Sequence, residues 1–469
     1  MLTTACKEPP LPSIDKGVRM SEPSTLASST LSRRRLLGYG AAAAGALTVA
    51  PALAACGSSS TSSSSGASAG ADAKADLVMT TWNIPADLIA YKKFAAEYKK
   101  THPGVNITVQ TTPNGDFNQY LSTQLAGGNA PDIIRNTWQQ IGRWAKNGGL
   151  IALDKYLAPD YGKGFGETFW SAAQLNGKVH GIPQHTDTFG TFYRTDVLAQ
   201  VGAKPPASLG AAWTWEEFLA LAREVKKVTG KAGISYGFEG VNTAYRWLPF
   251  LYMHGGKLME DDGVTPAIDN QLGIEAIAWF QQLYNEGLIP KSNTIKGSTT
   301  ASVENTFTTG QVGLMIWGDW IMGDIGKGLK QDKWNVTYMP RDQSAASDLG
   351  GNLLSVSKSS KNPAVAADFI QFVCNEANMK TFCETDLFLP VRTALSSTPL
   401  KFSSHQEQMT LFTEQATTVP AAMAKVETLP SFAAINQVLA DQLDLCFIGQ
   451  QTPQVTAKNI SDGIKNAAS

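Results

Sequence analysis

LVMTT, from Leu77 to Thr81, is a run of apolar and β-branched residues typical of a strand. A helical pattern follows over 86–100, and VNITV at 105–109 alternates as a second strand. A second helical pattern over 117–126 leads to a third short strand, Asp132-Ile133-Ile134. The order βαβαβ predicts an α/β fold with a mainly parallel sheet covered by helices.

Polar and aromatic residues follow each of these strands. They are Trp82-Asn83 after the first strand, Asn114 after the second, and Arg135 to Trp138 after the third. The carboxyl ends of parallel strands meet at one edge of the sheet, and ligands of open α/β sheets bind there. We therefore expect a binding site at this edge.

The second half of the chain repeats the alternation of strands and helices. Thr214 with Glu217 forms a capping-box pattern, and further helices are expected near 242–254 and 271–286. GLMIWGDW, Gly313 to Trp320, begins as an apolar strand and ends in two tryptophans around a glycine and an aspartate. We expect Gly318 to permit a tight turn there.

The N-terminus carries targeting signals. Ser32 to Leu37, with three arginines, precedes an Ala-rich apolar run and resembles a twin-arginine export signal; Leu53-Ala54-Ala55-Cys56 resembles a bacterial lipobox. The resemblance implies a signal peptide over 1–55 and lipidation of Cys56. The Ser/Gly/Ala-rich segment 56–75 is expected to be a flexible tether. Together these features predict an exported protein that is lipid-anchored to the outer face of the cell membrane.

Composition excludes several function classes. The 469 residues carry a formal net charge of −1, and no dense Lys/Arg block follows residues 33–35, which argues against nucleic-acid binding. Only five histidines occur, and the cysteines have no metal-site spacing, so no metal or cofactor is expected. Export would allow a disulfide between Cys374 and Cys383, but helical surroundings favour buried free thiols for these two and for Cys446.

Ordered motifs over 76–469 carry a family resemblance. They are Pro131-Asp132-Ile133, Gly149 to Asp154, Gly177 to Pro183, Phe192 to Asp196, Thr214 to Glu217, Phe307 to Trp320, Gly350 to Asn352, and Leu389 to Arg392. In the order and spacing of these motifs, the chain resembles the extracellular solute-binding proteins of sugar ABC importers, of the maltose-binding type. The resemblance implies a non-enzymatic receptor without cofactors, and we expect a monomer.

The family's fold has two α/β lobes, each with a mainly parallel sheet, joined by hinge strands. By resemblance, the first lobe comprises 76–185 and 339–392, and the second comprises 186–338 and 393–469, with the last hinge crossing at the start of that final segment. The expected partners are a sugar or oligosaccharide in the cleft between the lobes and the membrane permease of an ABC importer.

A sugar has a flat apolar face and a rim of hydroxyls, so its site needs aromatic surfaces together with carboxylates and amides. By resemblance, the expected ligand-binding residues are Trp82, Asn83, Asn136, Trp138, Gln139, Asp187, Tyr245, Arg246, Asp319, Trp320, Gly350, Gly351 and Asn352. Trp320 occupies the stacking position, whereas Trp317 is expected in the core. Trp138 could equally pack in the core, Asp187 could pair with an arginine, and Tyr245-Arg246 could begin a surface helix.

Two rival functions remain at this point. Gly233 to Gly237 fits the GxSxG pattern of hydrolases, and Asp187 with Asp319 is the candidate carboxylate pair of an exported glycoside hydrolase. A binding protein for another solute, such as a polyamine, is the second rival. Polyamine binders line their cleft with several acids, and the residues named above offer few.

Overall fold

The computed structural model describes residues 70–112 and 117–468. All of these residues belong to one compact unit, 63–469. The predicted signal peptide, the lipidation site Cys56 and Asn114 lie outside the described residues.

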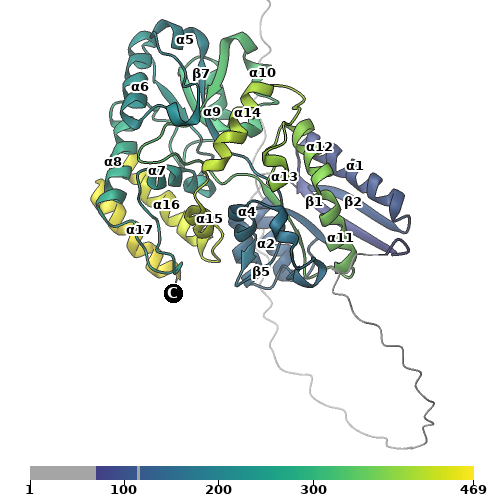
Figure 1. Ribbon diagram of the computed structural model, residues 1–469. Helices are drawn as coiled ribbons and strands as arrows, with labels where there is room; N and C mark the ends of the chain where they lie inside the picture. Colours follow the sequence, from purple (N-terminus) through teal and green to yellow (C-terminus); the bar gives the residue numbers. More distant parts are fainter. Residues whose placement is uncertain (1–69, 113–116, 469) are drawn as a thin grey trace, which may run out of the picture. The chain divides into compact units, whose positions relative to one another are not determined.

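The first sheet has five strands in the order β2-β1-β3-β11-β6. These strands are β1 (Ala75–Trp82), β2 (Val105–Thr112), β3 (Ile133–Thr137), β6 (Ile182–His185) and β11 (Asn352–Val356). Helices from distant parts of the sequence lie together beside it in Figure 1: α1 (Pro85–Thr101), α11 (Pro363–Val373) and α12 (Glu376–Asp386). Helices α2 (Phe117–Gly127), α3 (Trp138–Lys146) and α4 (Glu167–Ala172) and the small hairpin of β4 (Gln174–Leu175) and β5 (Lys178–Val179) complete this lobe.

The second sheet has four strands in the order β10-β7-β9-β8. They are β7 (Phe189–Arg194), β8 (Ile234–Tyr236), β9 (Leu314–Gly318) and β10 (Trp334–Thr337). Its helices, labelled in Figure 1, are α5 (Thr195–Gln200), α6 (Trp215–Thr229), α7 (Leu248–Met253), α8 (Gln271–Asn285), α9 (Thr300–Thr308), α10 (Ile325–Gly328) and α14 (Gln406–Gln415). Helices α15 (Ala421–Glu427), α16 (Phe432–Phe447) and α17 (Pro453–Ala468) follow, and α16 and α17 pack on α8.

The two-lobed α/β fold is confirmed, but neither sheet is mainly parallel. In the first sheet β1 is parallel to β2 and β3, while β11 is antiparallel to both β3 and β6. In the second sheet β7 is antiparallel to β9 and β10, and only β8 is parallel to β9. Parallel neighbours require long crossover connections. Strands β6 and β11 are instead connected to chain segments that link the two sheets. They therefore join the first sheet without the helical crossovers of a βαβ unit.

The chain passes between the sheets more than once. It runs from β6 to β7 through Thr186–Thr188, which we call the crossing segment, and from β10 to β11 through 338–351. A later passage lies between α13 (Thr393–Ser396), which contacts α12, and α14, which contacts β7 and β10. Thr186 of the crossing segment also pairs, as an isolated bridge, with Leu389 in the segment that precedes α13.

Several local expectations are confirmed. The Thr214 hydroxyl accepts from the Glu217 backbone N–H at 3.2 Å, and the Glu217 carboxylate accepts from the Thr214 N–H at 2.8 Å, completing the capping box of α6. The helix expected near 242–254 is a 3-10 turn, Val241–Trp247, followed by α7.

The three cysteines of the described chain are buried free thiols, as expected. Burial raises the pKa of the Cys446 thiol to about 11, so this thiol is protonated at neutral pH. Within residues 70–112 and 117–468, the structure contains no helix that is long and apolar enough to span a bilayer.

Candidate functional site

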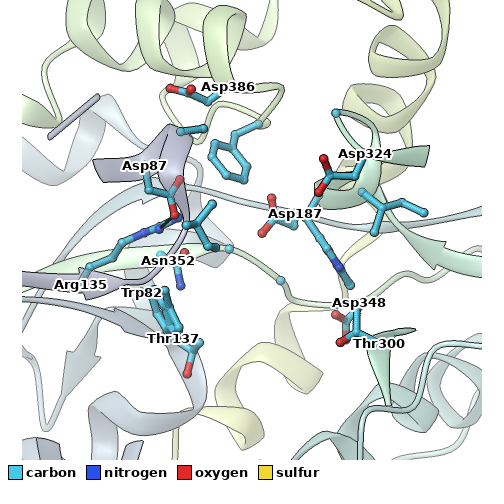
Figure 2. Close-up of a pocket in the computed structure, with 18 of the residues that line it drawn as sticks. Trp82, Asp87, Arg135, Thr137, Asp187, Thr300, Asp324, Asp348, Asn352 and Asp386 are labelled. Atoms are coloured by element: carbon cyan, nitrogen blue, oxygen red, sulfur yellow. Dashed lines mark hydrogen bonds and ion pairs between the residues drawn. The ribbon is translucent and has the colours of Figure 1, made fainter. Parts of the chain in front are cut away.

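A cavity of about 830 Å³ opens where elements of both sheets meet the crossing segment. Trp82, Asp87 and Arg135 come from the first sheet and its helix α1, while Thr300 and Trp320 belong to the second lobe. Figure 2 shows Asp187 between these walls, with Asp87 and Arg135 on one side and Asp348 and Thr300 on the other. The cavity therefore lies at the edge of the sheet that the sequence singled out.

Most of the residues proposed from the sequence lie around this cavity. Those that line it are Trp82, Gln139, Asp187, Tyr245, Arg246, Trp320, Gly350, Gly351 and Asn352. They come from six separate chain segments, which only the fold brings together.

Asn136 and Trp138 do not line the cavity, although both are fully buried. Side chains alternate across a strand, and it is Arg135 and Thr137 of β3 that face the opening. Trp138 donates its indole N–H to the carbonyl of Gly350 at 2.8 Å. This hydrogen bond fixes the position of Gly350, which lines the cavity.

Asn83 and Asp319 also lie outside the lining. Asn83 is at an exposed position just after β1. Asp319 is fully buried, and its carboxylate accepts from the Thr188 backbone N–H at 2.6 Å. Burial, and then the neighbouring Asp187, raise the pKa of Asp319 well above its usual value. Its position ties the end of β9 to the crossing segment.

The two tryptophans at the end of β9 have different environments. Trp317 is fully buried in the core, as expected, and donates to the Glu304 carboxylate at 3.3 Å. Trp320 is partly exposed and lines the cavity, with its ring 5.4 Å from that of Trp317 at an interplanar angle of 61°. The Arg246 guanidinium lies 4.9 Å from the centre of the Trp320 ring. Trp320 therefore presents an aromatic surface that its neighbours hold in position.

A 3-10 turn, Asp319–Ile321, follows Gly318 as expected, but the glycine is required by close packing and not by the turn. The φ of −90° at Gly318 is accessible to any residue. A Cβ at this position would lie 1.8 Å from the Trp320 ring. The absent side chain lets the indole fold back against the strand end.

The wall formed by the first lobe contains a buried ion pair that the sequence did not reveal. Arg135 of β3 pairs with Asp87 in the first turn of α1, and both side chains are almost fully buried. The guanidinium also lies 5.0 Å from the Trp82 ring centre, and Trp82 stacks on Phe117 at 4.2 Å. The pair fixes the orientation of this wall.

In the second lobe, Arg246 is the cation that lines the cavity, as Arg135 does in the first lobe. Its guanidinium donates to the Glu239 carboxylate at 2.6 Å and to the Gly237 carbonyl at 2.9 Å. The preceding residue, Tyr245, is held by a bond from its backbone N–H to the Asn436 side chain at 2.8 Å. Both residues are nearly buried, so they do not begin a surface helix.

Carboxylates are more numerous here than the sequence suggested. The cavity is lined by Asp87, Asp187, Glu304, Asp324, Asp348 and Asp386. Burial is the main cause that raises the pKa of Asp348 to about 7, with Arg246 opposing it and Asp187 adding to it. Burial likewise raises the pKa of Asp386 to about 6. The expectation of few acids was wrong because five of the six, all except Asp187, were not among the residues named from the sequence.

The raised pKa of Asp348 predicts a pH-dependent stability. An unfolded aspartate titrates near about 3.9, so as pH rises from there to about 7 the unfolded chain releases a proton that the folded chain keeps, and stability falls. Relative to Asp348→Asn, the unliganded wild-type protein should lose on the order of 2–3 kcal/mol between pH 5 and pH 8. Urea unfolding at several pH values measures this difference.

The control for that experiment is Asp332→Asn, since Asp332 is exposed. Its stability should follow the wild-type pH profile. If Asp348→Asn also follows it, the Asp348 carboxyl does not titrate as described.

Neither hydrolase pattern forms a catalytic arrangement. Ser235 of the GxSxG pattern lies fully buried within β8, where its hydroxyl donates to the Val303 carbonyl at 3.2 Å. Asp187 and Asp319 are neighbours, and Asp319 does not line the cavity. A glycosidase pair instead flanks the scissile bond about 5–10 Å apart. Within the described ranges, no group of three or more His, Cys, Asp or Glu residues has the geometry of a metal site.

Comparison with known proteins identifies the family. The lactose-binding protein of Rhizobium radiobacter is 26% identical over 307 residues, covering 63% of this chain and 69% of its own. The maltodextrin-binding protein MdxE of Bacillus subtilis (strain 168) is 26% identical over 315 residues, covering 65% and 72%. The crystal structure of the GacH receptor of Streptomyces glaucescens superposes with a TM-score of 0.71 at 23% identity, over 84% of this chain and 99% of that one. The family model described as bacterial extracellular solute-binding protein matches residues 82–380, and the chain belongs to this family.

Proposed function

We propose that the chain binds a sugar or oligosaccharide in the cavity and delivers it to an ABC importer without chemical conversion. The observation that carries this proposal is the lining itself. Trp82 and Trp320 stand on different lobes as partly exposed aromatic rings, among carboxylates and amides such as Asp187, Gln139 and Asn352. Such a lining matches the apolar face and the hydroxyl rim of a sugar ring.

The relatives support the same ligand class, since two of them are named as lactose-binding and maltodextrin-binding proteins. We further propose that Asn83, Asn136, Trp138 and Asp319 act indirectly, by supporting the lining residues. We also propose that the boundaries between the two lobes fall at 185/186, 338/339 and 392/393.

The proposed setting is the outer face of the cell membrane. The twin-arginine-like signal and the lipobox support export and anchoring through Cys56, and the tether over 56–75 would hold the folded part beside its permease. We also propose that the receptor is a monomer.

A ligand screen by thermal unfolding tests the proposed function. The panel contains neutral saccharides, amino sugars, polyamines and amino acids. A true ligand at 100 times its Kd stabilises the folded state by about 2.7 kcal/mol, so its midpoint should rise by several degrees. We expect a saccharide to produce this rise.

A rise with a polyamine and with no saccharide would refute the sugar proposal in favour of the polyamine alternative. Incubation with chromogenic glycosides addresses the hydrolase alternative. Turnover that disappears in Asp187→Asn would show that the chain is an enzyme.

A further inference from the structure

Four carboxyl groups gather at the crossing segment and form what we call the buried acid cluster: Asp187, Asp319, Asp348 and Glu427. Asp187 is 8% exposed, and the other three are fully buried. Asp187 and Asp348 line the cavity, while Asp319 and Glu427 lie behind them. Figure 2 shows the carboxylates of Asp187 and Asp348 at the same opening.

The hydrogen bonding of this cluster is incomplete. Neither carboxylate oxygen of Asp348 has a hydrogen-bond partner among the described residues, and one oxygen of Glu427 also lacks one. Asp319 and Asp187 lie close enough for a hydrogen bond between their carboxyls, which helps to keep a proton on Asp319. Glu427 uses its other oxygen to accept from the Gln139 side chain at 2.7 Å. Buried polar atoms normally have partners, so the cluster lacks donors on the side of the cavity.

The nearby cations do not supply these donors. Arg246 is bonded to Glu239 and Gly237, and Arg135 is paired with Asp87. His185 lies 3.7 Å from Asp187, but burial lowers its pKa and favours the neutral ring. Across the described part of the chain, Asp348 forms no ion pair. Burial raises the pKa of Asp319 and of Glu427 well above the usual value, so both hold protons at neutral pH. The carboxyls that face the cavity without a cationic partner are therefore those of Asp348 and Asp187.

A neutral sugar would meet only part of this need. Its hydroxyls can donate hydrogen bonds to the carboxylates, but they bring no charge into a site where unpaired charge is unfavourable. A protonated amine supplies up to three donors and a positive charge at one atom. An amine on a sugar ring would also keep the ring in reach of the aromatic surface of Trp320.

We propose that the solute is a saccharide bearing a protonated amine, with its nitrogen bound between Asp348 and Asp187. This inference rests on the proposed function and narrows its ligand class. Trp320 contacts the ring, and the ammonium group replaces the donors that the cluster lacks. The raised pKa of Asp348 fits this picture, since a bound cation favours its ionised form.

The test compares matched sugars that differ at one substituent. The amine forms are glucosamine, galactosamine and the β-1,4-linked glucosamine disaccharide, each measured beside its N-acetyl form and its parent hydroxyl sugar by calorimetry at pH 7. In at least one set the amine should bind at least tenfold more tightly, which corresponds to about 1.4 kcal/mol. The N-acetyl form, which has no charge, should lose this advantage.

Asp348→Asn should abolish the preference for the amine form over its parent hydroxyl sugar. The matched control is Asp386→Asn, because Asp386 also lines the cavity but belongs to α12 and lies outside the cluster. This control should keep the preference. Retention of the wild-type thermal midpoint, measured first, identifies variants that remain folded.

The outcomes separate this inference from the proposed function. If neutral saccharides bind and every amine form binds equally or more weakly, the inference is refuted and the sugar receptor stands. If no saccharide binds and a polyamine does, both are refuted. A preference that survives in Asp348→Asn and disappears in Asp386→Asn would overturn the assignment of the nitrogen to this cluster.

Discussion

Trp320→Ala is expected to weaken saccharide binding about 30-fold or more while the protein remains folded. Trp320 lines the cavity with a partly exposed ring, and Arg246 lies 4.9 Å from its centre. Truncation of a tryptophan at the centre of a binding site typically costs about 2 kcal/mol or more, which corresponds to this factor in Kd. Calorimetric titration with the saccharide found by the ligand screen measures the change.

Trp213→Ala is the matched control, because Trp213 is also partly buried but does not line the cavity. Its Kd should remain within a few-fold of the wild type. Trp320→Phe, which retains an aromatic surface, should recover part of the lost affinity. Unchanged binding by Trp320→Ala, with a normal thermal midpoint, would remove Trp320 from the site.

The fold could be predicted from the sequence where local patterns determine it. The segments around β1, β2 and β3 follow one another as a βαβαβ unit, and their parallel pairing matches that order. Strand β11 could not be placed this way. It joins β3 from more than 200 residues away in the sequence and runs antiparallel to it, which no local pattern encodes.

The site was predicted less well because neighbouring residues of a strand point to opposite faces. Motif matching selected Asn136, whereas the alternation in β3 places Arg135 and Thr137 at the cavity. If the inward position of one residue of β3 had been known, this alternation would have identified both. Strand geometry alone predicts that side chains alternate between two faces, but only the tertiary structure determines which face of β3 meets the cavity.

The buried acids illustrate a different limit. Asp348 precedes the Gly350-Gly351 motif, and nothing in the sequence near it distinguishes it from a surface aspartate. Three residues later, Gly351 packs closely on the crossing segment, where a Cβ would lie 2.5 Å from the Thr186 Cα. Gly351 also has a φ of +87°, which favours glycine. The glycines were recognisable as a motif, but the buried aspartate near them was not.

The ion pair between Asp87 and Arg135 should have the largest effect on stability. The side chains of Arg135 and Asp87 are only 2% and 1% exposed, so each charge depends on its partner in place of water. Loss of one partner from a buried ion pair typically costs about 3–5 kcal/mol, because the remaining charge is left unpaired. An exposed pair on the same helix, Lys100 with Glu97, is worth about 1 kcal/mol or less.

We therefore expect Asp87→Ala to lower the free energy of unfolding by about 3–5 kcal/mol, measured by urea denaturation of the unliganded protein. Glu97→Ala, the control on α1, should change it by no more than about 1 kcal/mol. The double variant Asp87→Leu with Arg135→Met replaces both charges by apolar groups, so it should be more stable than Asp87→Ala. Equal losses in Asp87→Ala and Glu97→Ala would contradict this account. Since Arg135 also lies against Trp82, the double variant should bind saccharide more weakly even when it is folded, which separates the pair's contribution to stability from its role in shaping the cavity wall.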